Sequence, residues 1–184
     1  AAVIGGCCGT TPEHIRAMTA VCLEIPYEPA GKKNLTMVSS YGKTVIFGEE
    51  SKIIGERINP TGKKKFKQAL VERDMDYILR EGIRQEDNGA HILDVNVGLP
   101  DIDEVSMMKE AVTALQGVTS LPLQIDTVDP RAMEEALRVY NGKPMVNSVS
   151  GKQESMDAVF PLIQKYGGVV VGLTLDETGI PETA

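Results

Sequence analysis

Two adjacent cysteines lie near the start of the chain, in the segment Gly5-Gly6-Cys7-Cys8-Gly9-Thr10. Neighbouring side chains on a regular strand point to opposite faces, so both thiols can reach one metal ion only where the backbone bends. The flanking glycines permit such a bend. An apolar run at 1–4 precedes the pair and a helix start, Thr11-Pro12-Glu13, follows it. The pattern predicts a strand end with two thiolates that could bind a soft metal ion.

A second group of polar side chains lies in runs that otherwise look like buried strands. Buried parallel strands usually read as continuous apolar runs, and burial of a carboxylate or amide costs several kcal/mol unless it is hydrogen-bonded. The polar residues in these runs are Glu56, Asn59, Asp94, Asn96, Gln124, Asp126 and Asn147. They predict a ligand with many polar edges, such as a pterin, whose N–H and NH₂ edge a carboxylate can accept at two points. Purine-like and sugar ligands would use similar groups.

These polar residues also have plainer interpretations. Asp94 and Asn96 could cap the loop that follows them, and Asp126 could accept hydrogen bonds from the amides of its own loop. Both interpretations remain open from the sequence alone.

Other reactive or charged residues are expected to be structural. Cys22 falls on the apolar face of a predicted helix, and His14 lies in its first turn. His91 begins a strand-like run, and Asp129 precedes a proline as a helix cap does. The run Lys63-Lys64-Lys65 is typical of a solvated face, with an anion-binding role as the alternative.

The elements that must position these groups follow a repeated order of strand and helix. A first helix is predicted from Thr11 to Cys22, and the pattern on either side of Tyr41-Gly42 fits a β-hairpin. Five apolar runs then predict strands at 52–58, 91–97, 121–128, 144–149 and 169–175. The helical stretches between them are 63–85, expected to break near Asp74, 101–117 with Asp101 as cap, 129–142 opened by Asp129-Pro130, and one around 156–166.

Strands that alternate with helices imply an α/β fold with a parallel sheet and helical crossovers. A doubly wound open sheet and a (β/α)₈ TIM-barrel type both fit this order. A full barrel takes about 250 residues, and only five strands follow residue 51. A barrel would therefore be incomplete in this chain.

Composition limits the classes of partner. The chain has 184 residues and a formal net charge of −7, which argues against nucleic acid or an anionic membrane as the main partner. We see no apolar run near the roughly 20 residues of a membrane span and no signal-peptide pattern. Three cysteines do not form a disulfide framework. We therefore expect a cytoplasmic protein.

The motifs in their order resemble those of the cobalamin-dependent methionine synthase family. Residues 4–15 resemble the end of its homocysteine-binding zinc domain, and residues 55–64, Gly-Glu-Arg-Ile-Asn-Pro-Thr-Gly-Lys-Lys, resemble the start of its pterin-binding domain. Residues 93–98, 125–126 and 147–148 resemble later strands of the same barrel. The resemblance covers nearly the whole chain.

The resemblance implies a domain order and a set of site residues. Residues 1–24 would be the last strand and helix of the zinc barrel, 25–51 an interdomain linker, and 52–184 the first part of the pterin barrel. Cys7 and Cys8 would be two of three zinc ligands, with homocysteine sulfur as the fourth. The residues that match the methyltetrahydrofolate pocket are Glu56, Asn59, Asp94, Asn96, Asp126 and Asn147. Asp126 and Asn147 would contact the pterin directly as the catalytic residues.

The resemblance also implies an activity and its partners. The family transfers a methyl group from 5-methyltetrahydrofolate through cobalamin to homocysteine, and cobalamin would be bound by a module outside this chain. The third zinc cysteine and the later pterin strands are not in the sequence, so we expect little or no turnover from the chain alone. The alternatives are a pterin-dependent methyltransferase that serves a separate corrinoid protein, a dihydropteroate synthase-like enzyme, and a non-catalytic incomplete fragment.

Overall fold

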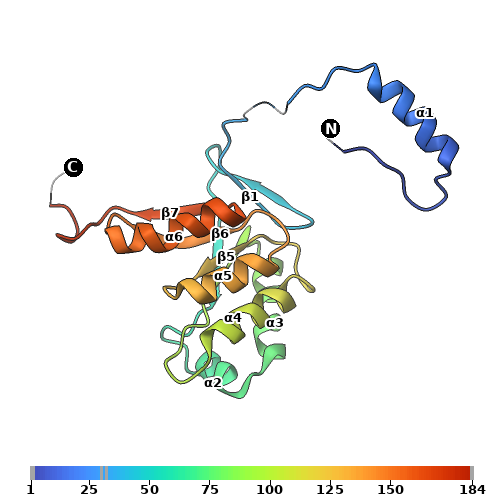
Figure 1. The fold of residues 1–184 in the computed structure, drawn as a ribbon. Coiled ribbons are helices and arrows are strands. Elements are labelled where there is room, and N and C mark those ends of the chain that lie inside the picture. The colour runs from blue at the N-terminus through green and yellow to red at the C-terminus, as the bar shows by residue number, and fades with distance from the viewer. Residues whose placement is uncertain (1–2, 30, 32, 183–184) are drawn as a thin grey trace. The chain divides into compact units, whose positions relative to one another are not determined.

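The computed structural model describes residues 3–29, 31 and 33–182, and it divides into two compact units, Ala1–Asn34 and Leu35–Ala184 (Figure 1). Within these described residues, none of the helices combines the length and the apolar character that a membrane crossing requires.

Among its described residues the first unit contains one helix, α1 (Pro12–Leu23). The His14 amide donates to the Thr11 hydroxyl at 3.5 Å, and the Thr11 amide donates to His14 Nδ1 at 3.1 Å. This capping box confirms the predicted helix start and the structural role of His14. Residues 3–7 form no strand, although the sequence predicted one that leads into the cysteines. A strand needs a neighbour for its backbone hydrogen bonds, and no described segment pairs with this one.

The second unit is built on a parallel five-stranded sheet in the order β3-β4-β5-β6-β7 (Figure 1). All five predicted strands are confirmed; four are shorter than their apolar runs, and β6 has the predicted length shifted by one residue. Their bounds are β3 (Ile54–Ile58), β4 (Ile92–Val95), β5 (Leu123–Asp126), β6 (Met145–Ser150) and β7 (Val169–Leu173). In the described residues the sheet is open, with β3 and β7 as its edges.

Helices cover one face of this sheet. They are α2 (Lys64–Glu72), α3 (Met75–Asp87), α4 (Glu104–Leu115), α5 (Pro130–Val139) and α6 (Gln153–Tyr166). The predicted break near Asp74 is confirmed, because Arg73 takes a left-handed conformation and Asp74 caps α3 by accepting from the Tyr77 amide at 3.0 Å. Asp129 caps α5 as predicted. The cap of α4 is Asp103 rather than Asp101, because the helix begins at Glu104 and the Asp103 carboxylate accepts from the Ser106 amide.

The other face of the sheet is covered at one end by a hairpin, β1 (Met37–Ser39) and β2 (Thr44–Ile46). Val38 and Val45 are buried against Ile92 of β4. The Tyr140 hydroxyl donates to the Ser39 carbonyl at 2.9 Å and accepts from the Leu123 amide at 3.1 Å, which ties the hairpin to the sheet. Residues 35–51 therefore lie in the second compact unit, within the segment 25–51 that the sequence predicts to be an interdomain linker with a possible β-hairpin.

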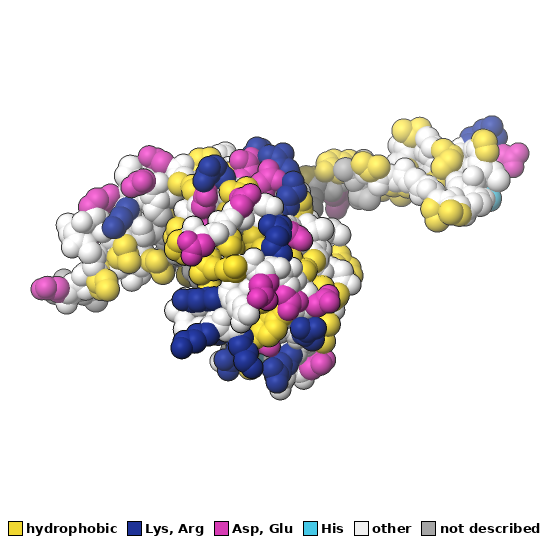
Figure 2. Space-filling view, turned by 90° about the horizontal axis from the view of Figure 1, so that it is seen from below, with side chains coloured by type: hydrophobic (Ala, Val, Ile, Leu, Met, Phe, Trp, Pro, Cys, Tyr) yellow, Lys and Arg dark blue, Asp and Glu magenta, His cyan; other side chains and the backbone are white. Residues whose placement is uncertain are grey.

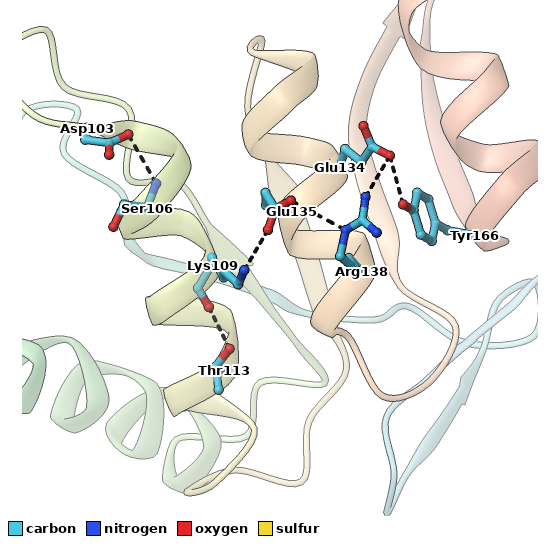
Figure 3. Close-up of polar contacts among 8 residues, drawn as sticks. All are labelled: Asp103, Ser106, Lys109, Thr113, Glu134, Glu135, Arg138 and Tyr166. Carbon is cyan, nitrogen blue, oxygen red and sulfur yellow. Dashed lines mark hydrogen bonds and ion pairs between the residues drawn. The ribbon is translucent and has the colours of Figure 1, made fainter.

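A chain of ion pairs joins the outer surfaces of α4, α5 and α6 (Figure 3). We call it the outer network; its members are Lys109, Glu134, Glu135, Arg138, Lys165 and Tyr166. Lys109 contacts Glu135 at 2.8 Å, and Arg138 contacts Glu134 at 3.2 Å. Lys165 and the Tyr166 hydroxyl both donate to Glu134 Oε1, at 2.8 and 2.9 Å. On the face seen in Figure 2, Lys and Arg side chains lie among Asp and Glu side chains.

Candidate functional site

Asp94 is a buried carboxylate on β4, between the edge strand β3 and β5. It lies two residues after Ile92 on β4, so its side chain is on the hairpin face of the sheet. Its register partner on β5 is Gln124, and the Gln124 amide donates to Asp94 Oδ1. Asp94 and Gln124 are 3% and 6% exposed. The sequence places Gln124 among the polar residues of the apolar runs, but it does not show that Gln124 pairs with Asp94.

Asp126 ends β5 and is held by a residue from the neighbouring strand. The Asn96 side-chain amide donates to Asp126 Oδ2 at 2.9 Å, and Asn96 Oδ1 accepts from the Gly98 amide at 2.9 Å. Asn96 therefore caps its own loop and also binds the second carboxylate. In the described part of the chain, Asp126 accepts no bond from the amides of its own loop, so that plainer interpretation is wrong. Asn147 on β6 is the register partner of Asp126.

Asn96 and Asp126 line a pocket of about 700 Å³ at the carboxyl ends of the strands. Its wall includes Leu99 and Ile102 from the loop after β4, and Pro60 and Thr61 from the loop after β3. Glu56, Asn59, Asp94 and Asn147 do not line this pocket. Of the six positions matched to a pterin site, the structure thus places two on the pocket wall and the others outside that wall.

A hydroxyl–carboxylate contact supports the far wall of the pocket. Thr127 directly follows Asp126, and its hydroxyl donates to Glu104 in the first turn of α4. The same hydroxyl accepts from the Asp129 amide at 3.1 Å. The loop after β5 is therefore fixed against α4, and with it the backbone that carries Asp126.

Glu56 on β3 pairs with Lys63. The Lys63 ammonium contacts both Glu56 carboxylate oxygens, at 3.1 and 3.2 Å. Lys64 and Lys65 are exposed, as predicted for a solvated face, but Lys63 is half-buried and the interpretation was wrong for it. Nothing in the sequence distinguishes Lys63 from the two lysines that follow it.

Burial and like charge act on the carboxylates of this region. The pKa of Asp94 is raised to about 6, mainly by burial; the hydrogen bonds from Gln124 and Asn59 lower it, and the negative charges of Asp126 and Glu56 raise it. Burial also raises the pKa of Asp126, with Glu56 acting in the same direction and the Asn96 bond against it. We call these three carboxylates and the amides of Asn96 and Gln124 the inner cluster.

The two cysteines lie in the first unit and are exposed. Across the described residues no group of three or more His, Cys, Asp and Glu side chains is placed to hold a metal ion. Zinc in proteins takes four ligands, usually thiolates and imidazoles. Cys7 and Cys8 thus fit as part of a zinc site but do not form one with the other described residues.

Comparison with known protein families gives two matches along the chain. Residues 55–183 match the family described as pterin binding enzyme, and residues 1–22 match the family described as homocysteine S-methyltransferase. The hairpin lies in the segment 23–54 between the two matches.

Two curated relatives are similar over almost the whole chain. The methionine synthase of Mycobacterium tuberculosis (strain ATCC 25618 / H37Rv) is 32% identical over 196 aligned residues, which cover 99% of this chain and 16% of that protein. The methionine synthase of Mycobacterium leprae (strain TN) is 32% identical, with 98% of this chain and 16% of that protein covered. The chain therefore spans about a sixth of the length of these relatives.

Solved structures of similar fold include two dihydropteroate synthases. The enzyme from Vibrio fischeri ES114 superimposes with a TM-score of 0.54 at 18% identity, covering 76% of this chain and 49% of that one. The Xanthomonas albilineans enzyme, in complex with indole-2-carboxylic acid and 6-chloroguanine, gives 0.51 at 20% identity, covering 68% and 46%. At these identities the likeness concerns the fold, which is of the (β/α)₈ TIM-barrel type with five strands in an open sheet.

Proposed function

Because this chain belongs to the pterin-binding enzyme family, we propose that its inner cluster binds the pterin ring of 5-methyltetrahydrofolate. The observation that carries the proposal is the meeting of Asn96 and Asp126, from neighbouring strands, on the wall of a pocket at the carboxyl ends of the strands. Ligands of barrel enzymes bind at this end of the sheet.

Asp126 has the chemistry to hold one edge of the pterin. A carboxylate offers about four acceptor positions and the Asn96 amide uses one of them, which leaves room for an N–H and an NH₂ group. Asn147 lies beside Asp126 in register and offers both a donor and an acceptor. We assign direct contacts with the ring to these two residues, and supporting roles to Glu56, Asn59, Asp94 and Asn96.

The charge of the inner cluster suits a methyl donor. The methyl group leaves N5 of the folate, which is a poor leaving group until it gains a proton or a hydrogen bond. Glu56, Asp94 and Asp126 place negative charge around the bound ring, which favours positive charge on it. The pKa of Asp94, raised to about 6, is typical of residues that exchange or share protons near neutral pH, and the pKa of Asp126 is raised as well.

For the whole protein we propose methionine synthase activity, in which homocysteine accepts the methyl group. The support is the 32% identity to proteins named methionine synthase and the match of residues 1–22 to homocysteine S-methyltransferases. From the resemblance to the cobalamin-dependent family we further propose cobalamin, which supplies a cobalt centre that carries the methyl group between the two substrates. Since the chain spans about a sixth of those relatives, we expect it to bind folate without completing turnover.

We also propose that Cys7 and Cys8 supply two ligands of a zinc ion, with further ligands from the rest of the protein and from homocysteine. Zinc, when bound, lowers the pKa of a coordinated thiol. The exposed neighbouring thiols support this role. Zinc content of the whole protein should fall in a Cys7→Ser variant and stay constant in a Cys22→Ser variant; equal zinc in both would contradict the assignment.

Isothermal titration with 5-methyltetrahydrofolate tests the central proposal. Asp126→Ala removes the carboxylate and should weaken binding by about 2–4 kcal/mol, roughly 30- to 1000-fold. Glu134→Ala is the matched control, because it removes a carboxylate of the outer network, which does not line the pocket. An Asp126→Ala variant that folds and binds as the wild type does would refute the site.

A further inference from the structure

Lys63 differs from the two lysines beside it in where its side chain lies. It is the N-cap residue of α2, but its side chain makes no capping hydrogen bond. Its ammonium instead contacts both oxygens of Glu56, at 3.1 and 3.2 Å, and the side chain is 22% exposed. A turn in which the Asn59 side chain accepts from the Thr61 amide at 2.9 Å leads the loop after β3 toward this position.

Glu56 connects Lys63 to the inner cluster. It lies two residues after Ile54 on β3, and its charge acts on both Asp94 and Asp126. Three carboxylates from three adjacent strands therefore share one region. Among the described residues, Lys63 is the only cation with an ion pair to any of the three.

The other polar and charged groups near Asp126 already have partners or lie outside the inner cluster. Asn96 donates to it, and Asn147 lies beside it in register. On the α4 side Glu104 accepts from Thr127. Further charged groups line the same pocket: Asp103, Asp129 and Arg131. Arg131 contacts Asp129 with two nitrogens, so its charge is already paired outside the inner cluster.

We propose that Lys63 is a positioning residue for pterin binding: it orients Glu56 and offsets part of the negative field on the carboxylates that hold the ring. This role of Lys63 rests on the proposed pterin site, because Lys63 would help to keep the carboxylates of that site ionised. Binding through Asp126 needs its carboxylate form, so affinity is lost as the pH falls through its pKa. Without the Lys63 charge, Glu56 repels a second negative charge more strongly. The acid limit of binding then moves to higher pH.

The test compares the pH profile of 5-methyltetrahydrofolate affinity in the wild type and in Lys63→Met. We expect the pH at which affinity is half lost to rise by about 0.5 unit, so that affinity at the wild-type midpoint falls roughly twofold. Lys63→Arg should restore the profile, because it keeps the charge. Lys64→Met is the matched control, since Lys64 is an exposed lysine with no contact to Glu56.

A double variant separates the electrostatic role from a structural one. Glu56→Gln should move the midpoint to lower pH, and Lys63→Met should produce a smaller shift in that background than in the wild type. An equally large shift without Glu56, or equal profiles for Lys63→Met and Lys64→Met, would overturn the proposal.

Carbon-13 NMR titration of the aspartate carboxyl groups provides a readout that does not need folate. Lys63→Met should raise the midpoints of Asp94 and Asp126 even in the free protein. If the wild type binds no folate at any pH, the proposed function fails, whereas unchanged carboxyl midpoints refute the role of Lys63 alone.

Discussion

The inner cluster and the outer network use the same acidic side chains and differ in what surrounds them. In the inner cluster, Asp94 is buried and Asp126 is half-buried; both are bound by neutral amides and lie near the negative charge of Glu56. In the outer network, Glu134 and Glu135 lie at the protein surface and contact cations directly (Figure 3). Burial and like charge raise the pKa of the inner carboxyls, whereas Lys165 and Lys109 lower the pKa of the outer ones.

The two groups of carboxylates therefore have different roles in the same domain. Paired surface carboxylates contribute little to the free energy of unfolding and serve to join neighbouring helices. Buried carboxylates without a direct cation oppose folding, and such groups are typical of ligand sites. Glu56 shares features of both groups, because it belongs to the inner cluster and also forms an ion pair with Lys63.

The largest effect is expected from a substitution on β4, two residues before Asp94 of the inner cluster. Ile92→Ala deletes a fully buried side chain that packs against the hairpin, and should lower the free energy of unfolding by about 3 kcal/mol. Val71→Ala on α2, where the side chain is 57% exposed, is the control and should change it by less than about 1 kcal/mol. Urea unfolding measures both. If both substitutions lowered the free energy of unfolding equally, the packing of Ile92 against the hairpin would not stabilise the domain.

A second prediction concerns the pH dependence of stability. The Asp94 carboxyl has a pKa of about 6 in the folded protein against 3.8 for an unperturbed aspartate, so its ionisation opposes folding above pH 6 and the penalty disappears as the pH falls toward 4. Asp94→Asn lacks this titration. Between pH 7.5 and pH 4.5 the wild type should therefore gain about 1–2 kcal/mol relative to the variant, after a discount for solvent screening.

Using the difference between two pH values removes any constant effect of the asparagine on the bonds from Gln124 and Asn59. Urea unfolding at each pH provides the measurement. A constant difference across this range would show that Asp94 titrates normally.

The smallest effect is expected in the outer network. Glu134→Gln weakens contacts with Lys165, Arg138 and Tyr166 at once, and should lower the melting temperature slightly at low salt. The loss should shrink in 1 M salt, because exposed charges are screened there. Since the partners lower the pKa of Glu134, its contribution is also lost as the pH falls below about 4.5. A salt-independent loss would instead point to packing around Tyr166.

Much of the fold could be predicted because its signals are local. The five apolar runs became the five strands, the helix break fell at Asp74, and Asp129-Pro130 opened α5. Caps and apolar periodicity act over three or four residues, so they can be read from neighbours in the chain. Where two aspartates compete, as Asp101 and Asp103 do before α4, the same signals cannot choose between them.

The sequence by itself determined which residues carry the chemistry: the two adjacent cysteines and the carboxylates and amides at the strand ends. Only the tertiary structure decided which of them meet. Asp94 bonds to Gln124 and Asn96 to Asp126, each pair 30 residues apart, and Lys63 turns back to Glu56. Such pairs depend on strand register and on the path of loops, which are set by the packing of the whole sheet rather than by neighbours in the chain. The same packing made the hairpin part of the second unit and raised the pKa of Asp94, since burial is a property of the folded chain alone.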